Sequence, residues 1–324
     1  MTAANARSLL ALRPVNAVHR LEPRSEACPI SLREIVRALE GRSGTLPIVA
    51  APIGAVARGA LLAAKEATAV VGLAIPPHSA PERWFAVVAR AADELAPRLP
   101  FFVSAEVRVE DGDDGLERAF VAAHRLVEAG ITHLAIDVSA VALARRAQAA
   151  AQVAGFAAER EIAIDAVLPV AGGAVDPESA IAFVEEFEGW GMRADVVSAR
   201  LPPAGDAEVA RAQLAALDAL GTELGGRAVL RRGPLSPALA AGMAASSLRL
   251  CEDGGTALSA GLRAVPAELR SAAEGEQGRG EVALPDAVSD RLEALVYAEV
   301  ATLLDQLGAA GTASRLAQVF ASRV

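Results

Sequence analysis

Short apolar runs alternate along this chain with longer segments in which apolar residues recur at helical spacing. The clearest example flanks DDGLERAFVAAHRLVEAG with PFFVSAEV on one side and AGITHLAIDVSA on the other. Two buried strands joined by such a helix form a βαβ unit, whose strands pair in parallel. Strands that are covered on both faces appear in a sequence as continuous apolar runs. The pattern therefore predicts a parallel sheet with helices packed against it.

The same alternation occurs eight times between Leu46 and about Leu269. The predicted strands span residues 46–52, 70–77, 100–107, 129–140, 161–170, 194–203, 227–233 and 248–255. Eight strand–helix units predict an α/β fold in the form of a closed (β/α)8 TIM barrel. An open doubly wound sheet is the structural alternative, but such a sheet seldom contains eight regular units.

Further segments lie before and after the predicted barrel. We expect an N-terminal arm over residues 1–30, the barrel over 31–270, a polar connector over 271–285 and C-terminal helices over 286–324. A helix with Ser31 as its N-cap should begin the barrel segment. Asp176 followed by Pro177 marks another helix start, because proline suits the first helical position.

The long C-terminal helix should bury one apolar stripe against the barrel or against a partner subunit. The residues expected on this stripe are Leu292, Leu295, Val296, Glu299 and Leu303.

Composition and charge narrow the range of functions. Apolar residues make up 53% of the chain, yet no apolar run approaches the roughly 20 residues that span a bilayer. The net charge of −9 argues against a nucleic-acid partner. Two cysteines, Cys28 and Cys251, do not make a disulfide scaffold, so a cytoplasmic location is expected. The first 20 residues hold three arginines and no acid, which is also typical of a transit peptide.

Carboxylates end several of the predicted strands. Glu106 and Asp137 close neighbouring strands, and Asp165 lies in the next one. Parallel sheets and barrels place their chemistry at the carboxyl ends of their strands. Such carboxylates could act as catalytic acid–base groups, or could bind Mg²⁺ through waters. The alternative is a hydrogen-bonded polar layer that closes the barrel.

Four stretches in the same order resemble the class II ketose-bisphosphate aldolases, including the family of the non-catalytic subunit of tagatose-bisphosphate aldolase. These stretches are AGITHLAIDVSA, VDPESAIAFVEEFEGWGMRADVVSA, GRAVLRRGPLSPALAAGMAASSLRLCEDGGTALSAGLRAV and, more weakly, VSDRLEALVYAEV. The resemblance covers the chain from about Ser31 to Pro266. It implies a TIM barrel and a place in carbohydrate metabolism.

The zinc chemistry of that family does not carry over to this sequence. The positions that match its zinc ligands and catalytic groups hold Glu106, Val107, Val167, Pro202, Pro203 and Arg231. The four histidines of the chain are His19, His78, His124 and His133, and only His78 lies near the carboxyl end of a strand. A catalytic zinc usually needs three protein ligands, so we expect no zinc. The only lysine, Lys65, lies on a helix outside the barrel and cannot serve as a Schiff-base lysine there.

The resemblance also points to a phosphate or anion site. The residues expected there are Arg231, Arg232, Gly233, Gly254, Gly255 and Thr256, since arginine forks and helix N-termini suit phosphates. Arg231 matches an inward-facing ligand position, so it should point into the mouth, with Arg232 in the loop above it. Its expected partners are Glu106, Asp165 and Glu252. The alternative is that the arginine pair only neutralises Glu106, Asp137 and Glu252.

Three functions remain open on these observations. The first is a zinc-less, non-catalytic aldolase-like subunit, or pseudoenzyme, that binds a sugar phosphate or a partner subunit. The second is an active lyase or isomerase that uses Glu106, Asp137 or Asp165, with or without Mg²⁺, on a phosphorylated sugar or keto acid. The third is a structural protein whose barrel mouth is filled by its own side chains. In each case we expect a homo-oligomer without nucleic-acid or membrane partners.

Overall fold

The structure is a computed structural model of the 324-residue chain. It describes residues 9–40, 45–76, 79–168, 170, 175–233, 235–243, 250–252, 284 and 286–322, with the backbone alone at 237 and 250–252. The predicted connector, apart from Leu284, and the segment 256–269 after the eighth predicted strand lie outside these residues.

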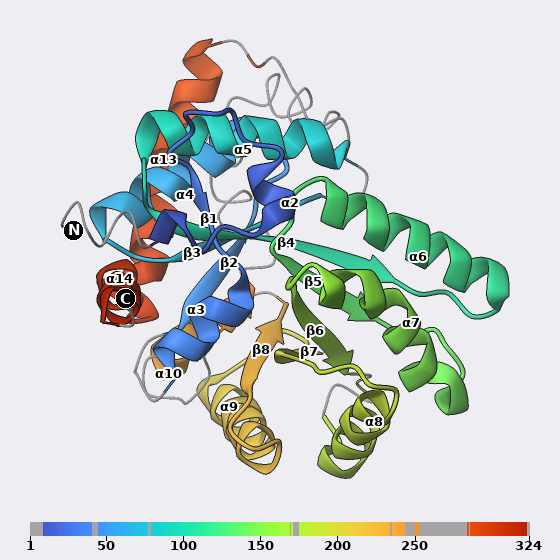
Figure 1. The fold of residues 1–324 in the computed structure, drawn as a ribbon. Helices are drawn as coiled ribbons and strands as arrows, with labels where there is room; N and C mark the ends of the chain where they lie inside the picture. The colour runs from blue at the N-terminus through green and yellow to red at the C-terminus, as the bar shows by residue number, and fades with distance from the viewer. Residues whose placement is uncertain are drawn as a thin grey trace.

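Eight parallel strands form a closed barrel (Figure 1). They are β2 (Leu46–Ala50), β3 (Val71–Ala74), β4 (Pro100–Arg108), β5 (His133–Asp137), β6 (Ala163–Leu168), β7 (Val196–Arg200), β8 (Ala228–Arg232) and β9 (Leu250–Glu252). Each strand pairs with the next along the chain, and β9 pairs with β2, which closes the ring. The predicted TIM barrel is confirmed, and the open sheet is excluded.

Helices cover the outside of this barrel. They are α4 (Gly54–Glu66), α5 (Pro81–Leu95), α6 (Asp113–Glu128), α7 (Arg146–Glu159), α8 (Pro177–Gly189), α9 (Ala207–Glu223) and α10 (Pro237–Met243), with a 3₁₀ turn, η1 (Leu143–Arg145), before α7. Asp176 caps α8 as predicted, because its carboxylate accepts a hydrogen bond from the backbone N–H of Ser179. None of the described helices is long and apolar enough to cross a membrane.

The N-terminal segment closes the amino end of the barrel. It contains α2 (Val15–Val18), β1 (Cys28–Pro29), which pairs with the start of β4, and α3 (Leu32–Leu39). Asn16 donates hydrogen bonds to the carbonyls of Val127 and Ile131, which precede β5. Ser31 stands before α3 as expected, but its hydroxyl donates to the carbonyl of Glu161 and makes no capping bond. The hydroxyl that we expected to cap the helix is therefore used in a tertiary contact.

The C-terminal helices, α13 (Asp286–Gln306) and α14 (Thr312–Ala321), pack on the barrel (Figure 1). The buried face of α13 differs from the predicted stripe and consists of Val288, Leu292, Val296, Val300 and Leu304. Leu292 and Val296 of the predicted stripe are thus buried, Leu295 and Leu303 are half-buried, and Glu299 is exposed. The helix turns its strict i, i+4 row toward α4, because Gly59 there lets the two backbones approach closely. A Cβ at Gly59 would lie 2.6 Å from the carbonyl oxygen of Glu293.

Candidate functional site

The inward-facing side chains of five neighbouring strands form a polar network inside the barrel. Side chains alternate between the two faces of a strand, so residues two apart share the interior. The strand register aligns Ser104 with His133, and Arg200 with Arg232. The members of the network are Ser104, Glu106, His133, Asp165, Ser198, Arg200 and Arg232.

Arg232 lies at the centre of this network. Its Nη2 is 2.8 Å from Oδ2 of Asp165 and its Nη1 is 3.1 Å from Oε2 of Glu106. Its Nε donates to the hydroxyl of Ser198 at 3.0 Å. The side chain is only 2% exposed. A buried guanidinium is costly unless carboxylates and hydrogen bonds compensate it, and here the end of β8 places the cation between two carboxylates.

Asp165 and His133 lie deeper, and both are fully buried. Nδ1 of His133 lies 2.9 Å from the hydroxyl of Ser104, and Nε2 lies 3.5 Å from Oδ2 of Asp165. Burial by itself would raise the pKa of Asp165, but the charge of Arg232 and the contact with His133 outweigh it and hold that pKa below its usual value. Although Ser104, His133 and Asp165 are the residue types of a hydrolytic triad, their burial inside the barrel keeps them from a substrate.

The outer part of the network is formed by Glu106 and Arg200. Nη2 of Arg200 lies 2.7 and 2.8 Å from the two carboxylate oxygens of Glu106. The Arg200 side chain is 53% exposed and that of Glu106 is 30% exposed. These two residues therefore connect the buried ion pairs with the solvent at the mouth. The direct arginine–glutamate pairing expected of a polar layer is present.

The structure reverses the predicted order of the arginine pair. Arg232, not Arg231, faces the interior, because it shares a face with Ser198 and Asp165 and its neighbour must point the other way. Our expectation placed the inward position one residue too early. Arg231 is also buried, but its guanidinium donates to the carbonyls of Gly233 at 2.9 Å and Pro202 at 3.0 Å.

The loops that follow β7 and β8 are thereby tied together. Arg231 reaches the loop after β7, and the backbone N–H of Leu201 donates to the carbonyl of Arg232. Gly233 has a φ of +117°, and a Cβ there would lie 2.5 Å from the carbonyl oxygen of Leu201. Only glycine suits this close approach without strain.

The remaining predicted residues are a buried carboxylate, an exposed lysine and several residues that the structure does not describe. Asp137 is buried and accepts a hydrogen bond from the backbone N–H of Ser139 at 2.9 Å. Lys65 is exposed on α4, outside the barrel as expected. Gly254, Gly255, Thr256 and His78 lie outside the described residues, as do the side chains of Cys251 and Glu252.

Sequence reasoning missed Ser104, His133 and Ser198 as members of the network. A signal for two of them was present, because Ser104 and Ser198 lie two positions before Glu106 and Arg200 on their strands. His133 begins its strand, and the amino end of a barrel strand is usually a place for stability rather than chemistry. Its burial and its hydrogen bond to Ser104 agree with that role.

The described side chains at the carboxyl end of the barrel do not suit a zinc ion. No group of three or more His, Cys, Asp or Glu side chains in the described ranges could hold a metal. Asp165 and Glu106 already bind a guanidinium, and that fixed positive charge would repel a divalent cation.

Solved structures of other proteins share this architecture. No protein-family model matches the chain, and no curated protein matches its sequence. The YdjI aldolase from Escherichia coli K12 is 13% identical with a TM-score of 0.64, over 88% of this chain and 99% of that one.

The second, from Coccidioides immitis and assigned as a fructose-1,6-biphosphate aldolase, is 13% identical with a TM-score of 0.59, over 90% and 99% of the two chains. The third, from Sinorhizobium meliloti 1021 and assigned as a tagatose 6-phosphate kinase, is 20% identical with a TM-score of 0.55, over 86% and 97%. At these identities the likeness is one of fold, and this chain has the TIM-barrel fold of structures that include aldolases.

Proposed function

We propose that this chain is a non-catalytic, aldolase-like subunit that binds a phosphorylated sugar at the carboxyl end of its barrel. The observation that carries the proposal is the position of Arg232, whose guanidinium lies between Asp165 and Glu106. A fixed side-chain cation would then take the part that a bound metal plays in the class II aldolases, which the sequence resembles.

The carboxylates of the network are poor candidates for acid–base catalysis. A general base must reach the substrate, and its pKa should lie near the working pH. Asp165 is fully buried, and its pKa is shifted below its usual value, away from neutrality. Glu106 holds two arginines at once. Both carboxylates therefore fit a role in holding the arginines better than a role in moving protons.

Arg200 is the side chain best placed to meet an anion at the mouth. It is more than half exposed, and its ion pair with Glu106 uses only Nη2. The guanidinium is a planar fork that can hold a phosphate with two parallel hydrogen bonds. Glu106 would then orient Arg200 from behind, while the ties that Arg231 makes fix the shape of the neighbouring loops.

Titration with sugar phosphates tests this proposal. Fructose 1,6-bisphosphate and tagatose 1,6-bisphosphate should raise the melting temperature, since a ligand of the folded state stabilises it, whereas free fructose and tagatose should not. Arg200→Gln should weaken binding about tenfold or more, which is the value of a charge-assisted hydrogen bond. Arg125→Gln is the matched control, because Arg125 is an exposed arginine paired with Glu82 on the outer helices.

An aldol-cleavage assay and a metal analysis complete the test. We expect no turnover with added zinc, with Mg²⁺ or with a chelator, and no stoichiometric zinc in the purified protein. Turnover that is lost in Glu106→Gln or Asp137→Asn would contradict the proposal and favour an active lyase. The absence of binding to every sugar phosphate would favour a purely structural barrel.

A further inference from the structure

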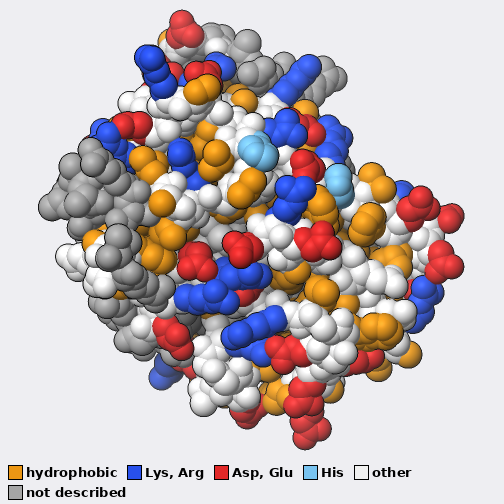
Figure 2. All heavy atoms as spheres, viewed as in Figure 1, with side chains coloured by type: hydrophobic (Ala, Val, Ile, Leu, Met, Phe, Trp, Pro, Cys, Tyr) orange, Lys and Arg blue, Asp and Glu red, His pale blue; other side chains and the backbone are white. Residues whose placement is uncertain are grey.

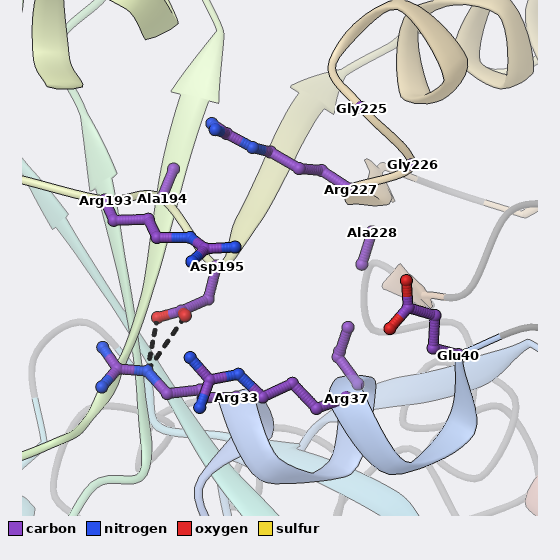
Figure 3. Close-up of a pocket in the computed structure, with 11 residues that line it drawn as sticks. Arg33, Arg37, Glu40, Arg193, Ala194, Asp195, Gly225, Gly226, Arg227 and Ala228 are labelled. Carbon is purple, nitrogen blue, oxygen red and sulfur yellow. Dashed lines mark hydrogen bonds and ion pairs between the residues drawn. The ribbon is translucent and has the colours of Figure 1, made fainter.

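A second cluster of arginines lies at the opposite, amino end of the barrel (Figure 3). It lines a cavity of about 120 Å³ between α3 and the segments that lead into β7 and β8. Its charged lining residues are Arg33, Arg37, Glu40, Arg193, Asp195 and Arg227. Four guanidiniums thus share the cavity wall with two carboxylates. The space-filling view of this face shows basic side chains gathered over the region of α3 and β8, with acidic ones beside them (Figure 2).

The hydrogen bonds of these arginines leave several donors unused. Arg33 binds Asp195 through Nε at 3.0 Å, and Arg37 binds Glu34 through Nη1 at 3.2 Å. Arg193 is exposed, and within the described part of the chain it makes no hydrogen bond or ion pair. Arg227 pairs with Glu188 through Nη2, while its buried Nη1 has no hydrogen-bond partner among the described residues.

Bringing these positively charged arginines together costs electrostatic energy. Arg33 and Arg37 lie four residues apart on α3, and like charges at that spacing repel each other. Arg193 adds a third positive charge from the segment before β7. Figure 3 shows its guanidinium close to Asp195, on the opposite side of that carboxylate from Arg33 of α3. Asp195 pairs with Arg33 and Glu34 pairs with Arg37, whereas Arg193 has no partner among the described residues. An anion in the cavity would compensate the charge of Arg193.

We propose that this cavity binds a small phosphorylated anion, at a site separate from the mouth of the barrel. The four arginines come from α3, from the segment before β7 and from the segment before β8, so they line the cavity from three parts of the chain. Donors on several elements can bind the oxygens of a phosphate group from more than one side. Because the cavity lies at the amino end, this ligand would act as an effector and not as a substrate of the mouth.

Calorimetric titration of the full-length chain with inorganic pyrophosphate tests the site. We expect saturable binding that weakens as salt is added, because salt screens exposed charges. Arg193→Gln should lower the affinity about tenfold, the value of one charge-assisted hydrogen bond, without lowering stability, since Arg193 holds no described partner. Arg83→Gln should change nothing, because Arg83 is likewise an exposed arginine for which the described residues offer no partner.

Two further variants distinguish an anion site from a cluster of charges that only supports the fold. Glu40→Gln removes a negative charge from the cavity wall and should tighten pyrophosphate binding, an effect that a supporting role would not produce. Arg200→Gln changes the mouth and should leave this binding unchanged, while Arg193→Gln should leave sugar-phosphate binding at the mouth unchanged.

The proposal fails if pyrophosphate does not bind. That result would show that these arginines only support the fold, through ion pairs such as those with Asp195, Glu34 and Glu188. It also fails if Arg83→Gln weakens binding as much as Arg193→Gln does, or if only Arg200→Gln weakens it. None of these results bears on whether sugar phosphates bind at the mouth.

Discussion

Arg232 and Asp165 form a buried ion pair across the inside of the barrel, with Nη2 and Oδ2 2.8 Å apart. The two residues come from strands that are not neighbours, β8 and β6, with β7 between them. Ser198 of the intervening β7 accepts a hydrogen bond from Nε of Arg232, so this arginine links three strands. The stability of the barrel should therefore depend on keeping this buried cation and its carboxylate together.

Replacing Arg232 by methionine should lower the free energy of unfolding by about 3–5 kcal/mol, because Asp165 would be left buried without its partner. Urea denaturation measures this loss. Arg200→Gln, at the exposed end of the same network, should cost less than about 1 kcal/mol. In the double variant Arg232→Met with Asp165→Leu, part of the loss should be recovered, since no buried charge is left alone. Equal losses for Arg232→Met and Arg200→Gln would contradict the central place of Arg232.

The same pair should make stability depend on acidity. The folded-state pKa of Asp165 lies below the value of about 3.9 in an unfolded chain. The folded protein therefore binds fewer protons than the unfolded chain in this range. The resulting stability is present above about pH 4 and is lost as the pH falls through the folded-state pKa. Unfolding free energies measured across this range should decline with falling pH.

Asp165→Asn should be less stable at neutral pH and should show a shallower decline in acid. Asp305→Asn, at an exposed carboxylate of α13, serves as the control and should keep the slope of the natural chain. An unchanged slope in Asp165→Asn would mean that other carboxylates cause the acid sensitivity.

The barrel could be predicted from the sequence because its signal is repeated. Each apolar run followed by a helical segment is a soft indication, but eight in order leave few architectures. Within a strand, alternation fixes which residues share a face. Glu106 and Asp165 were predicted among the polar groups of the mouth because they lie at or near the carboxyl ends of their strands.

Alternation alone does not say which of the two faces is the interior. The register must come from the packing of neighbouring strands, and the chain offers Arg231 and Arg232 as equally polar choices. An alignment error of one residue exchanged their roles. The same kind of limit applies to α13, where Leu292 and Leu295 are both apolar, and only the close contact with Gly59 selects the buried row.

Cys28 should be unreactive in the folded protein. Its side chain is buried in β1, and burial raises the pKa of the thiol to about 12 although the charge of Arg13 opposes the shift. The thiolate is the reactive form, so iodoacetamide at about pH 8 should not label this residue until the chain is unfolded in urea. Peptide mapping by mass spectrometry reads Cys28 separately from Cys251. Labelling of Cys28 at equal rates with and without urea would contradict its burial.

The C-terminal helices should be needed for a stable barrel. Five apolar residues of α13 are buried, and the backbone N–H of Val70 bonds to the hydroxyl of Thr312 at the start of α14. A chain that ends at Pro285 should expose the apolar surface of α4 and aggregate. Light scattering after gel filtration measures this, with a chain that ends at Ser322 as the control. A soluble truncated chain with unchanged melting would show that the helices are dispensable.

The contact between α4 and α13 can be tested at a single position. Gly59→Ala places a Cβ 2.6 Å from the carbonyl oxygen of Glu293 and 3.0 Å from the backbone nitrogen of Tyr297, so the helices must move apart. Overpacking of this kind costs about 1–3 kcal/mol, which exceeds the gain of roughly 1 kcal/mol that alanine brings to a helix.

Gly155→Ala is the matched control, because Gly155 is also inside a helix, α7, but has no atom within 4 Å of the added Cβ. This change should stabilise the protein by about 0.4–1 kcal/mol. Thermal unfolding should therefore shift in opposite directions for the two variants. If both variants melt at higher temperatures than the natural chain, α13 is not held against α4 at Gly59, and the C-terminal helices pack more loosely than the structure indicates.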